Sequence, residues 1–336
     1  ELVDDLLSAC KDASRKGFFP VLQPAIGIGS AFEGWCPSED EVVFRMLVPL
    51  KPPRGHDFHL EVGTKGQTPD QDSHIRVELK CTCDGEQLEE DMLCFIHPTK
   101  TKTNQAPSLL LTLCTGAYLD VHKTVLWFKH SVMAWLEALP QICPYTVKML
   151  PSQRSCMMEA TTSCRTKILI EILFGVQQGD SDIFLISRSP QKDSTPSTVW
   201  LQSCAVAEAK FFKYVARNIQ PGSLHLTCLC ICCCIRKNTS ISLYAVKTVV
   251  MHLLTLRGWS DWCEEDFLTR LADIMQCLTD SVEKKELYHF FTGNDNVPKE
   301  IILPPDFLET KPLNLFKCLE EDSATHTKAL QELKEL

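Results

Sequence analysis

GSAFEGWCPSEDEVVFRMLVPL, residues 29–50, joins a glycine-serine turn to a polar loop and then to an apolar run. The run at residues 42–48 is rich in β-branched and apolar side chains and predicts a buried strand. Glu39 and Glu41 occupy alternate positions where this strand begins, so both carboxylates project from one face and could share a cation. The stretch therefore combines a turn, an acidic pair and a strand in one short segment.

The turn at Gly29 and Ser30 predicts a phosphate-binding site of the nucleotidyltransferase type. Small residues let backbone N–H groups approach a phosphate, and nearby carboxylates neutralise the Mg²⁺ that bridges the attacking and leaving oxygens. An ordinary turn followed by a solvated strand edge accounts for the same residues, because both features are common in proteins. Both interpretations are open on these residues alone.

A single carboxylate, Glu171, interrupts the most apolar run in the first half of the chain, KILIEILFGV at residues 167–176. A charge inside a central strand is unfavourable unless it is paired or bound to a metal ion. We therefore expect Glu171 to complete a triad with Glu39 and Glu41. A solvent-facing position on the strand is the alternative.

The composition is that of a globular protein and argues against nucleic acid as a partner. The chain has 336 residues, of which 44% are hydrophobic and 23% charged, enough apolar material for a large core. Its length suggests two domains or one bilobal unit. The formal net charge of -9 disfavours a broad nucleic-acid surface, since phosphate binding needs a basic face.

The chain contains 18 cysteines, a high number. Their spacing does not match a small disulfide scaffold, so reduced and mostly buried thiols are expected, with an oxidised exterior as the alternative. The run from Cys228 to Cys234 follows His225, but no second ligand group follows at zinc-finger spacing. We predict a core helix there, because cysteine packs as a small hydrophobe.

Cys81, Cys83, Cys94 and His97 are a second set of residues of the types that bind zinc. The gaps between the cysteines, one residue and then ten, lack the closely spaced pairs of structural zinc sites. The spacing therefore predicts no zinc.

Hydrophobic periodicity predicts a sheet-containing first half and a helical second half. Strands are expected at residues 42–50, 56–62, 75–81, 149–163 and 167–176, with the strand at 56–62 paired to the one before it. Helices are expected at residues 1–16, 107–139, 199–218, 222–235, 240–256, 263–279, 285–291 and 323–336. The polar, proline-containing stretch at 187–197 divides the chain into lobes at residues 1–198 and 199–336.

Several phrases along the chain together resemble the Mab-21 family, whose best known enzyme is cyclic GMP-AMP synthase. They are Gly29-Ser30, FRMLVP at 44–49, Glu171, Trp200, YAVKTVVMH at 244–252, Asp261-Trp262, Leu278 and LYHFF at 287–291. Within this family the chain is most similar to the inositol trisphosphate receptor-interacting proteins, and among these to the like-1 branch. The resemblance implies a bilobal α+β nucleotidyltransferase-type fold, with a mixed β-sheet lobe, an all-helical C-terminal lobe and a ligand cleft between them.

The resemblance also carries site residues over to this chain. Gly29 and Ser30 correspond to the turn that cradles the phosphates, and Glu39, Glu41 and Glu171 correspond to three metal-holding acids. Active members usually have aspartate at the positions of Glu41 and Glu171, and each glutamate adds roughly an ångström of reach to a two-metal geometry. The resemblance therefore implies a catalytically weak or inactive member. Mg²⁺ or Mn²⁺ with a nucleoside triphosphate would be its cofactors if the site were intact.

Two hypotheses of function follow. The first is a pseudoenzyme that works as a binding and regulatory domain for a membrane receptor or calcium-release channel, the inositol trisphosphate receptor by resemblance. It would be a single-pass membrane protein, anchored through residues N-terminal to Glu1. The alternative is an active metal-dependent nucleotidyltransferase that makes a nucleotide second messenger.

The surroundings of Glu171 separate these two hypotheses. Arg45 or Lys167 folded into the acid site would favour the pseudoenzyme, whereas an unpaired Glu171 beside Glu41 would favour the enzyme. The cysteine-rich zinc insertion of the DNA-sensing synthase has no counterpart in this chain, in agreement with the acidic net charge. Zinc-dependent DNA sensing is therefore not expected.

Overall fold

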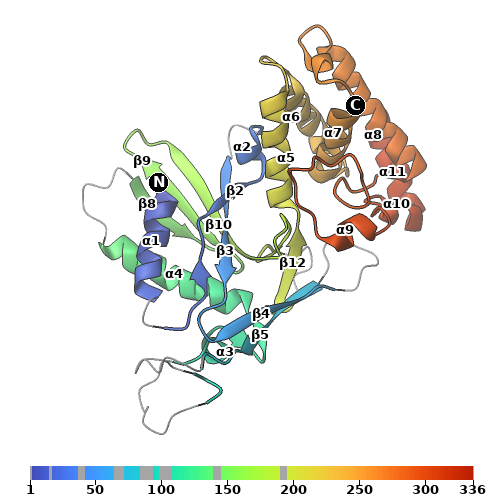
Figure 1. The fold of residues 1–336 in the computed structure, drawn as a ribbon. Coiled ribbons are helices and arrows are strands. Elements are labelled where there is room, and N and C mark those ends of the chain that lie inside the picture. Colours follow the sequence, from blue (N-terminus) through green and yellow to red (C-terminus); the bar gives the residue numbers. More distant parts are fainter. Residues whose placement is uncertain are drawn as a thin grey trace.

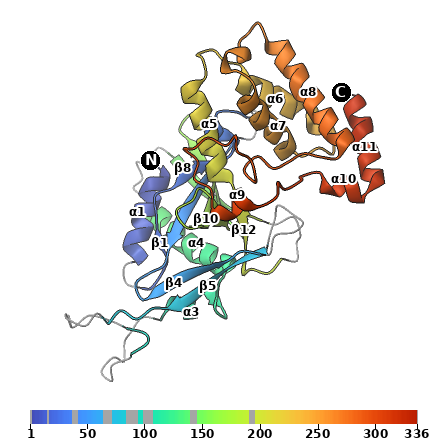
Figure 2. The same ribbon diagram turned by 45° about the vertical axis from the view of Figure 1, so that its right-hand side comes forward.

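A computed structural model describes residues 2–14, 17–36, 42–63, 72–83, 94–97, 107–138, 145–189 and 195–335. It is an α+β protein in which a twelve-stranded mixed sheet is followed by a helical C-terminal region, as the sequence predicted. Figure 1 shows the sheet with its helices beside the helical region, and Figure 2 shows the same two parts after a rotation.

Two long apolar strands form the centre of the sheet. β3 (Val43–Lys51) and β10 (Lys167–Gln177) run parallel to each other, although more than a hundred residues separate them in the chain. Leu47, Val48 and Phe174 within them are buried, as expected for strands covered on both faces. The two strands that carry Arg45 and Glu171 are therefore direct neighbours.

The remaining strands pair antiparallel around this centre. β1 (Val21–Leu22) and β2 (Ile26–Ile28) pair with β3. On the opposite edge of β10 lies β9 (Cys156–Thr162), which pairs in turn with β8 (Tyr145–Leu150). The sheet continues through β11 (Phe184–Ile186), β12 (Val199–Ser203), β5 (Asp72–Leu79), β4 (His56–Glu61), β7 (Tyr118–Leu119) and β6 (Cys114–Thr115).

Helices cover both faces of the sheet. α1 (Leu2–Ser14) and α4 (Val121–Ala138) pack side by side against one face, where Leu6, Phe128 and Trp200 are fully buried. α3 (Leu109–Thr112) lies near the end of β5, and α2 (Ser30–Glu33) follows β2. The other face meets α5 (Ala205–Asn218), because Val206 joins an apolar cluster with residues of β3 and β10.

The helical region has its own apolar core, to which Phe211, Val249 and Phe290 contribute. Its helices are α5, α6 (His225–Ile235), α7 (Leu243–Leu256), α8 (Phe267–Lys284), α9 (Pro305–Glu309), α10 (Lys317–Glu321) and α11 (Ser323–Lys334), with short 3₁₀ turns at Arg236–Asn238 and Trp259–Trp262. Among the described residues, none of the helices is both long and apolar enough to span a bilayer.

One predicted strand pairing and one predicted helix are wrong. β4 pairs with β5 and not with β3. The predicted helix at 199–218 begins with a strand, since β12 pairs with both β11 and β5 before α5 starts. The sheet therefore extends through Ser203, beyond the predicted division at 198.

Two further helix predictions need correction. Residues 107–139 contain α3 and the β6–β7 hairpin before α4 begins. Residues 285–291 are not helical; the backbone of Leu287 and His289 instead bonds to Leu315 and Leu313 in a short bridge. Lys285, with a φ of +58°, ends α8 in the left-handed region and turns the chain into this segment.

Candidate functional site

The predicted phosphate turn leads directly into α2. Gly29 has a φ of +78°, which favours glycine, and its carbonyl oxygen accepts the N–H groups of Phe32 and Glu33 at 3.0 Å each. Ser30 is the first residue of this four-residue helix. A Cβ atom placed on Gly29 would lie 3.8 Å from Nη1 of Arg45. The turn and the Arg45 guanidinium are therefore neighbours.

Glu171 is paired with Arg45. The register of β3 and β10 sets the two residues opposite each other, and Arg45 Nε donates to Glu171 Oε2 at 2.9 Å. The side chain of Glu171 is 17% exposed and that of Arg45 is 44% exposed. Lys167 bonds instead to Glu159 on β9, at 3.2 Å. Arg45 is thus folded onto the acid, the arrangement that favours the pseudoenzyme hypothesis.

The rest of the predicted acid triad is not placed. Glu39 and Glu41 lie outside the described residues, so the meeting of all three carboxylates stays a prediction. At Glu171 itself, a metal ion would lie beside the positive guanidinium of Arg45, and like charges repel. The described half of the site is consequently less suited to a divalent cation than an unpaired acid would be.

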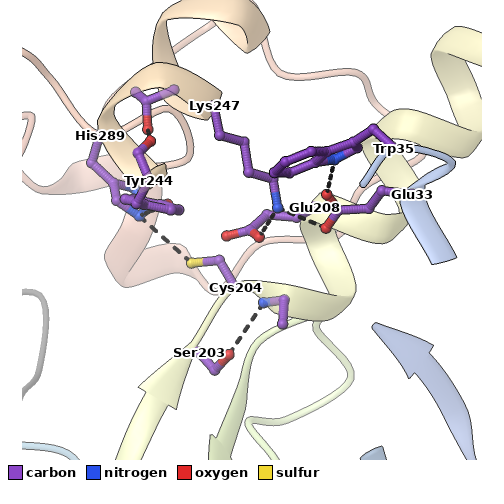
Figure 3. Close-up of polar contacts among 10 residues, drawn as sticks. Glu33, Trp35, Ser203, Cys204, Glu208, Tyr244, Lys247 and His289 are labelled. Carbon is purple, nitrogen blue, oxygen red and sulfur yellow. Dashed lines mark hydrogen bonds and ion pairs between the residues drawn. The ribbon is translucent and has the colours of Figure 1, made fainter. Parts of the chain in front are cut away.

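A second charged cluster lies buried where α2, α5 and α7 meet. Lys247 on α7 donates to Glu33 Oε1 at 2.6 Å and also to Glu208 on α5 (Figure 3). The indole Nε1 of Trp35 donates to Glu33 Oε2 at 2.8 Å. The side chains of Lys247, Glu33 and Glu208 are 5%, 0% and 11% exposed. We call Glu33, Lys247 and Glu208 the junction triad, because it links the turn after β2 to two helices of the C-terminal region.

The junction triad keeps a charge in an apolar setting. Burial alone would lower the pKa of Lys247, but the two carboxylates raise it above its ordinary value. Burial raises the pKa of Glu33, and Lys247 acts in the opposite direction. One ammonium group therefore pairs with two carboxylates. Removing Lys247 would leave more unpaired charge than removing either glutamate.

A chain of hydrogen bonds extends from the junction triad into the helical region. Phe291 N–H donates to Nδ1 of His289, so Nε2 of this ring carries the proton and lies 2.8 Å from the Tyr244 hydroxyl. Burial and the nearby Glu208 carboxylate raise the pKa of the Tyr244 hydroxyl, and Cys204 Sγ lies 3.9 Å from Nε2 of His289 (Figure 3). Burial lowers the pKa of His289 to about 4. The histidine is therefore neutral at physiological pH.

The segment that follows α2 is also held by α6. Trp35 belongs to the apolar core of the helical region, and Cys230 Sγ donates to the carbonyl oxygen of Cys36 at 2.7 Å. Gly34 has a φ of +87° and lies close to Leu226. The α2 segment is thus fixed to α5, α6 and α7, although it belongs to the sheet-containing part of the sequence.

Comparisons with known proteins bear on this arrangement. Residues 231–302 match the family model described as Mab-21 protein HhH/H2TH-like domain. The chain is 31% identical over 348 residues to inositol 1,4,5-trisphosphate receptor-interacting protein-like 1 of Rattus norvegicus, a match that covers 99% of the chain. It is 28% identical over 357 residues to inositol 1,4,5-trisphosphate receptor-interacting protein of Homo sapiens, again over 99% of the chain.

The chain is therefore similar to the inositol 1,4,5-trisphosphate receptor-interacting proteins over nearly its whole length. The resemblance inferred from the sequence is therefore confirmed. The chain spans 63% of the length of the rat relative and 65% of the human one.

The sequence alone did not reveal the junction triad of this chain. Lys247 lies in YAVKTVVMH, which carried part of the family resemblance but received no role. The signal was present, since Lys247 is a lone charge in an apolar helix, as Glu171 is in an apolar strand. Its partners were not visible, because Glu33 and Glu208 lie 214 and 39 residues away.

The two cysteine-containing sets behave differently in this chain. Cys228, Cys232 and Cys233 are buried on α6 in the apolar core, so the predicted core helix is confirmed. The second set, around Cys81, was predicted from its spacing to bind no zinc, and that stays a prediction. The ligand atoms of its four residues lie within 4.8 Å of one another.

Proposed function

We propose that this chain is a non-catalytic, pseudo-nucleotidyltransferase domain that binds and regulates a membrane receptor or calcium-release channel. The names of its relatives point to the inositol 1,4,5-trisphosphate receptor as that partner. The observation that carries the non-catalytic part is the ion pair between Arg45 and Glu171. It supplies a permanent protein cation at an acid that an active enzyme would offer to a metal ion.

The physical argument concerns charge and geometry at the acid site. Two-metal catalysis needs carboxylates that are free to hold divalent cations at set distances from the reacting oxygens. In this chain one oxygen of Glu171 accepts a hydrogen bond from the positively charged guanidinium of Arg45. A bound metal would meet that charge, so metal affinity should be low.

We also propose that the full-length protein is a single-pass membrane protein, with its membrane span N-terminal to Glu1. The support for this is the family resemblance. A span in that position would hold the domain beside a channel in the same membrane and raise its effective concentration there.

The nucleotide arm of the test is a thermal unfolding series. The chain is melted with ATP or GTP, with and without Mg²⁺ or Mn²⁺, and the mixtures are assayed for new nucleotide products. We expect no metal-dependent shift and no product. An active site saturated at a hundredfold over Kd would stabilise the fold by roughly 2.7 kcal/mol, and that shift would disappear in Glu171→Ala.

The partner arm uses the immobilised chain and detergent-solubilised inositol 1,4,5-trisphosphate receptor. We expect retention of the receptor by the wild-type chain and equally by Arg45→Ala/Glu171→Ala, because a binding role does not need the acid site. A chain that retains no receptor would contradict the proposed partner, whatever the nucleotide result.

The second candidate function is an active metal-dependent nucleotidyltransferase that makes a nucleotide second messenger. Its support is the retained turn, since Gly29 keeps the positive φ that lets backbone N–H groups approach a phosphate. In that case Mg²⁺ or Mn²⁺ with a nucleoside triphosphate would be its cofactors. A metal-dependent shift with product formation would establish this candidate over the pseudoenzyme.

A further inference from the structure

Four residues of the zinc-binding types meet beside the end of β5. Cys81 and Cys83 follow this strand, and Cys94 and His97 belong to a separate short segment of the chain. His97 Nδ1 lies 3.5 Å from Cys81 Sγ, 3.7 Å from Cys83 Sγ and 3.7 Å from Cys94 Sγ. The Sγ atoms of Cys81 and Cys94 are 3.9 Å apart. We call these four residues the Cys₃His cluster.

The separations of the ligand atoms match the edges of a tetrahedron around zinc. Zn–S bonds of about 2.3 Å and Zn–N bonds of about 2.0 Å imply ligand separations of about 3.8 Å between two sulfurs and about 3.5 Å between sulfur and nitrogen. The four separations given above lie within a few tenths of an ångström of these values, and the remaining two, from Cys83 Sγ to the other two sulfurs, are at most 4.8 Å. We propose that Cys81, Cys83, Cys94 and His97 bind one Zn²⁺ as a structural Cys₃His site.

A disulfide, a calcium or magnesium site and a catalytic zinc site each fit the cluster less well. The Sγ atoms of Cys81 and Cys94 are 3.9 Å apart, whereas a disulfide needs about 2.05 Å. Ca²⁺ and Mg²⁺ prefer oxygen ligands, and this set offers sulfur and nitrogen. Four protein ligands leave no open position, which is the pattern of a structural rather than a catalytic zinc site.

The spacing itself contains one short pair that points to zinc. Cys94 and His97 are separated by two residues, a gap found in structural zinc sites. Cys81 and Cys83 are closer than usual, but both lie beyond the last residue of β5, where the backbone no longer alternates and the two side chains can turn to the same point.

The surroundings of Cys94 suit a thiolate ligand. Cys94 is buried, and backbone hydrogen bonds from Thr82, His97 and Ile96 reach its sulfur. Outer hydrogen bonds of this kind orient metal ligands and hold them in place.

A ring cluster anchors the same segment to the sheet. Phe95, between two of the ligands, packs edge-on against Phe18 at 4.6 Å and against His56 at 5.1 Å between ring centroids. His56 is buried, and its Nε2 accepts the backbone N–H of Leu109 at the start of α3. A zinc ion in the Cys₃His cluster would thus fix Phe95 against the core and stabilise the packing of α3.

The test measures metal content directly. The chain is purified under reducing conditions with Zn²⁺ present, and bound metal is quantified by mass spectrometry. We expect one zinc per chain in the wild type, and visible absorption of tetrahedral thiolate-bound cobalt when Co²⁺ replaces it. Cys83→Ser and His97→Asn should each lose the stoichiometric zinc. Cys164→Ser, which alters an exposed cysteine outside the cluster, is the matched control and should keep it.

Chelation provides a readout that does not depend on the variants folding. Removing the metal from the wild-type chain should lower its melting temperature, and added Zn²⁺ should restore it, because the ion binds only the folded site. Wild-type protein that holds no zinc and takes up no Co²⁺ after reduction would overturn the proposal. Equal zinc content in Cys83→Ser and the wild type, or a disulfide within the cluster in the reduced protein, would overturn it as well.

Discussion

The junction triad and the Arg45–Glu171 pair are both contacts between carboxylates and a cation, and they lie in opposite environments. The junction triad is sealed, with side chains at most 11% exposed, whereas Arg45 beside Glu171 is 44% exposed. Water can replace either partner of the open pair, but nothing replaces Lys247 in the closed triad without leaving charge in an apolar core. Of these two contacts, only the Arg45–Glu171 pair, which we call the open pair, can exchange its partners. The junction triad, which we also call the closed triad, has a structural role.

The sharpest way to break this comparison is to remove each cation in turn. Lys247→Met leaves two buried carboxylates without a partner and should lower the free energy of unfolding by about 3–5 kcal/mol. Arg45→Met removes a cation from a solvated pair and should cost about 1 kcal/mol or less. Urea unfolding of both variants measures the difference.

A rescue variant separates lost charge from lost packing. Lys247→Met/Glu208→Gln removes one of the stranded carboxylates and should recover part of the stability lost in Lys247→Met. Equal effects of Lys247→Met and Arg45→Met would show that burial does not distinguish the two contacts.

Acid should lower the stability of the folded protein through protonation of His289, which lies beside the junction triad. Its pKa is about 4 in the folded protein, compared with about 6.5 when exposed. The unfolded chain therefore binds the proton first, so stability is full above about pH 6.5 and falls towards pH 4, by up to roughly 3 kcal/mol. His289→Gln should flatten this part of the pH profile of the melting temperature.

The matched control for the pH profile is His122→Gln, at an exposed position of α4. It should leave the acid-induced loss as it is in the wild type. If both variants show the wild-type slope between about pH 6.5 and pH 4, the buried ring is not the group that confers the acid sensitivity.

The indole of Trp35 tests how much the closed triad depends on a neutral donor. Trp35→Phe removes the bond to buried Glu33 and should cost about 1.5–3 kcal/mol, since bonds to charged groups are the stronger ones. Trp259→Phe, which removes a partly buried bond to the Leu254 carbonyl, should cost about 1 kcal/mol. A larger loss of stability in Trp259→Phe than in Trp35→Phe would contradict the prediction that the bond to Glu33 is the stronger one.

The smallest effect should be the coupling within the open pair. A double-mutant cycle of Arg45→Gln and Glu171→Gln should give a coupling energy below about 1 kcal/mol, because both side chains reach solvent. A coupling above about 2 kcal/mol in the same unfolding assay would mean that this pair, too, is structural.

The sequence predicted the elements whose signal is local. β3 and β10 followed from continuous apolar runs, and α7 from its apolar periodicity. β12 was missed because its apolar residues run almost directly into those of α5, and a short apolar run fits either element. The segment at 285–291 was mistaken for a helix because its partner strand, near Asn314, carries no sign of the pairing.

The candidate sites divide in the same way. The turn at Gly29 and the lone acid Glu171 were recognisable from local pattern, but the ion pair with Arg45 depends on the register of two distant strands. The junction triad and the Cys₃His cluster are each formed by segments that are separated in the sequence and come together only in the fold. A single sequence does not show which distant segments pack together, so spacing alone did not reveal how close Cys94 and His97 lie to Cys81 and Cys83.

The position of Trp35 has a consequence for synthesis on the ribosome. Its indole completes the core of the helical region, and neighbouring Glu33 waits for Lys247, 214 residues further along the chain. At ordinary translation speeds that interval lasts roughly 10–40 s, and for most of it the α2 segment has none of its helical partners, because α5 begins only at Ala205. The α2 segment therefore cannot complete its packing until the helical region has been synthesised. In a nascent chain that ends before α7, Trp35 would lack part of its packing and be accessible to chaperones and proteases.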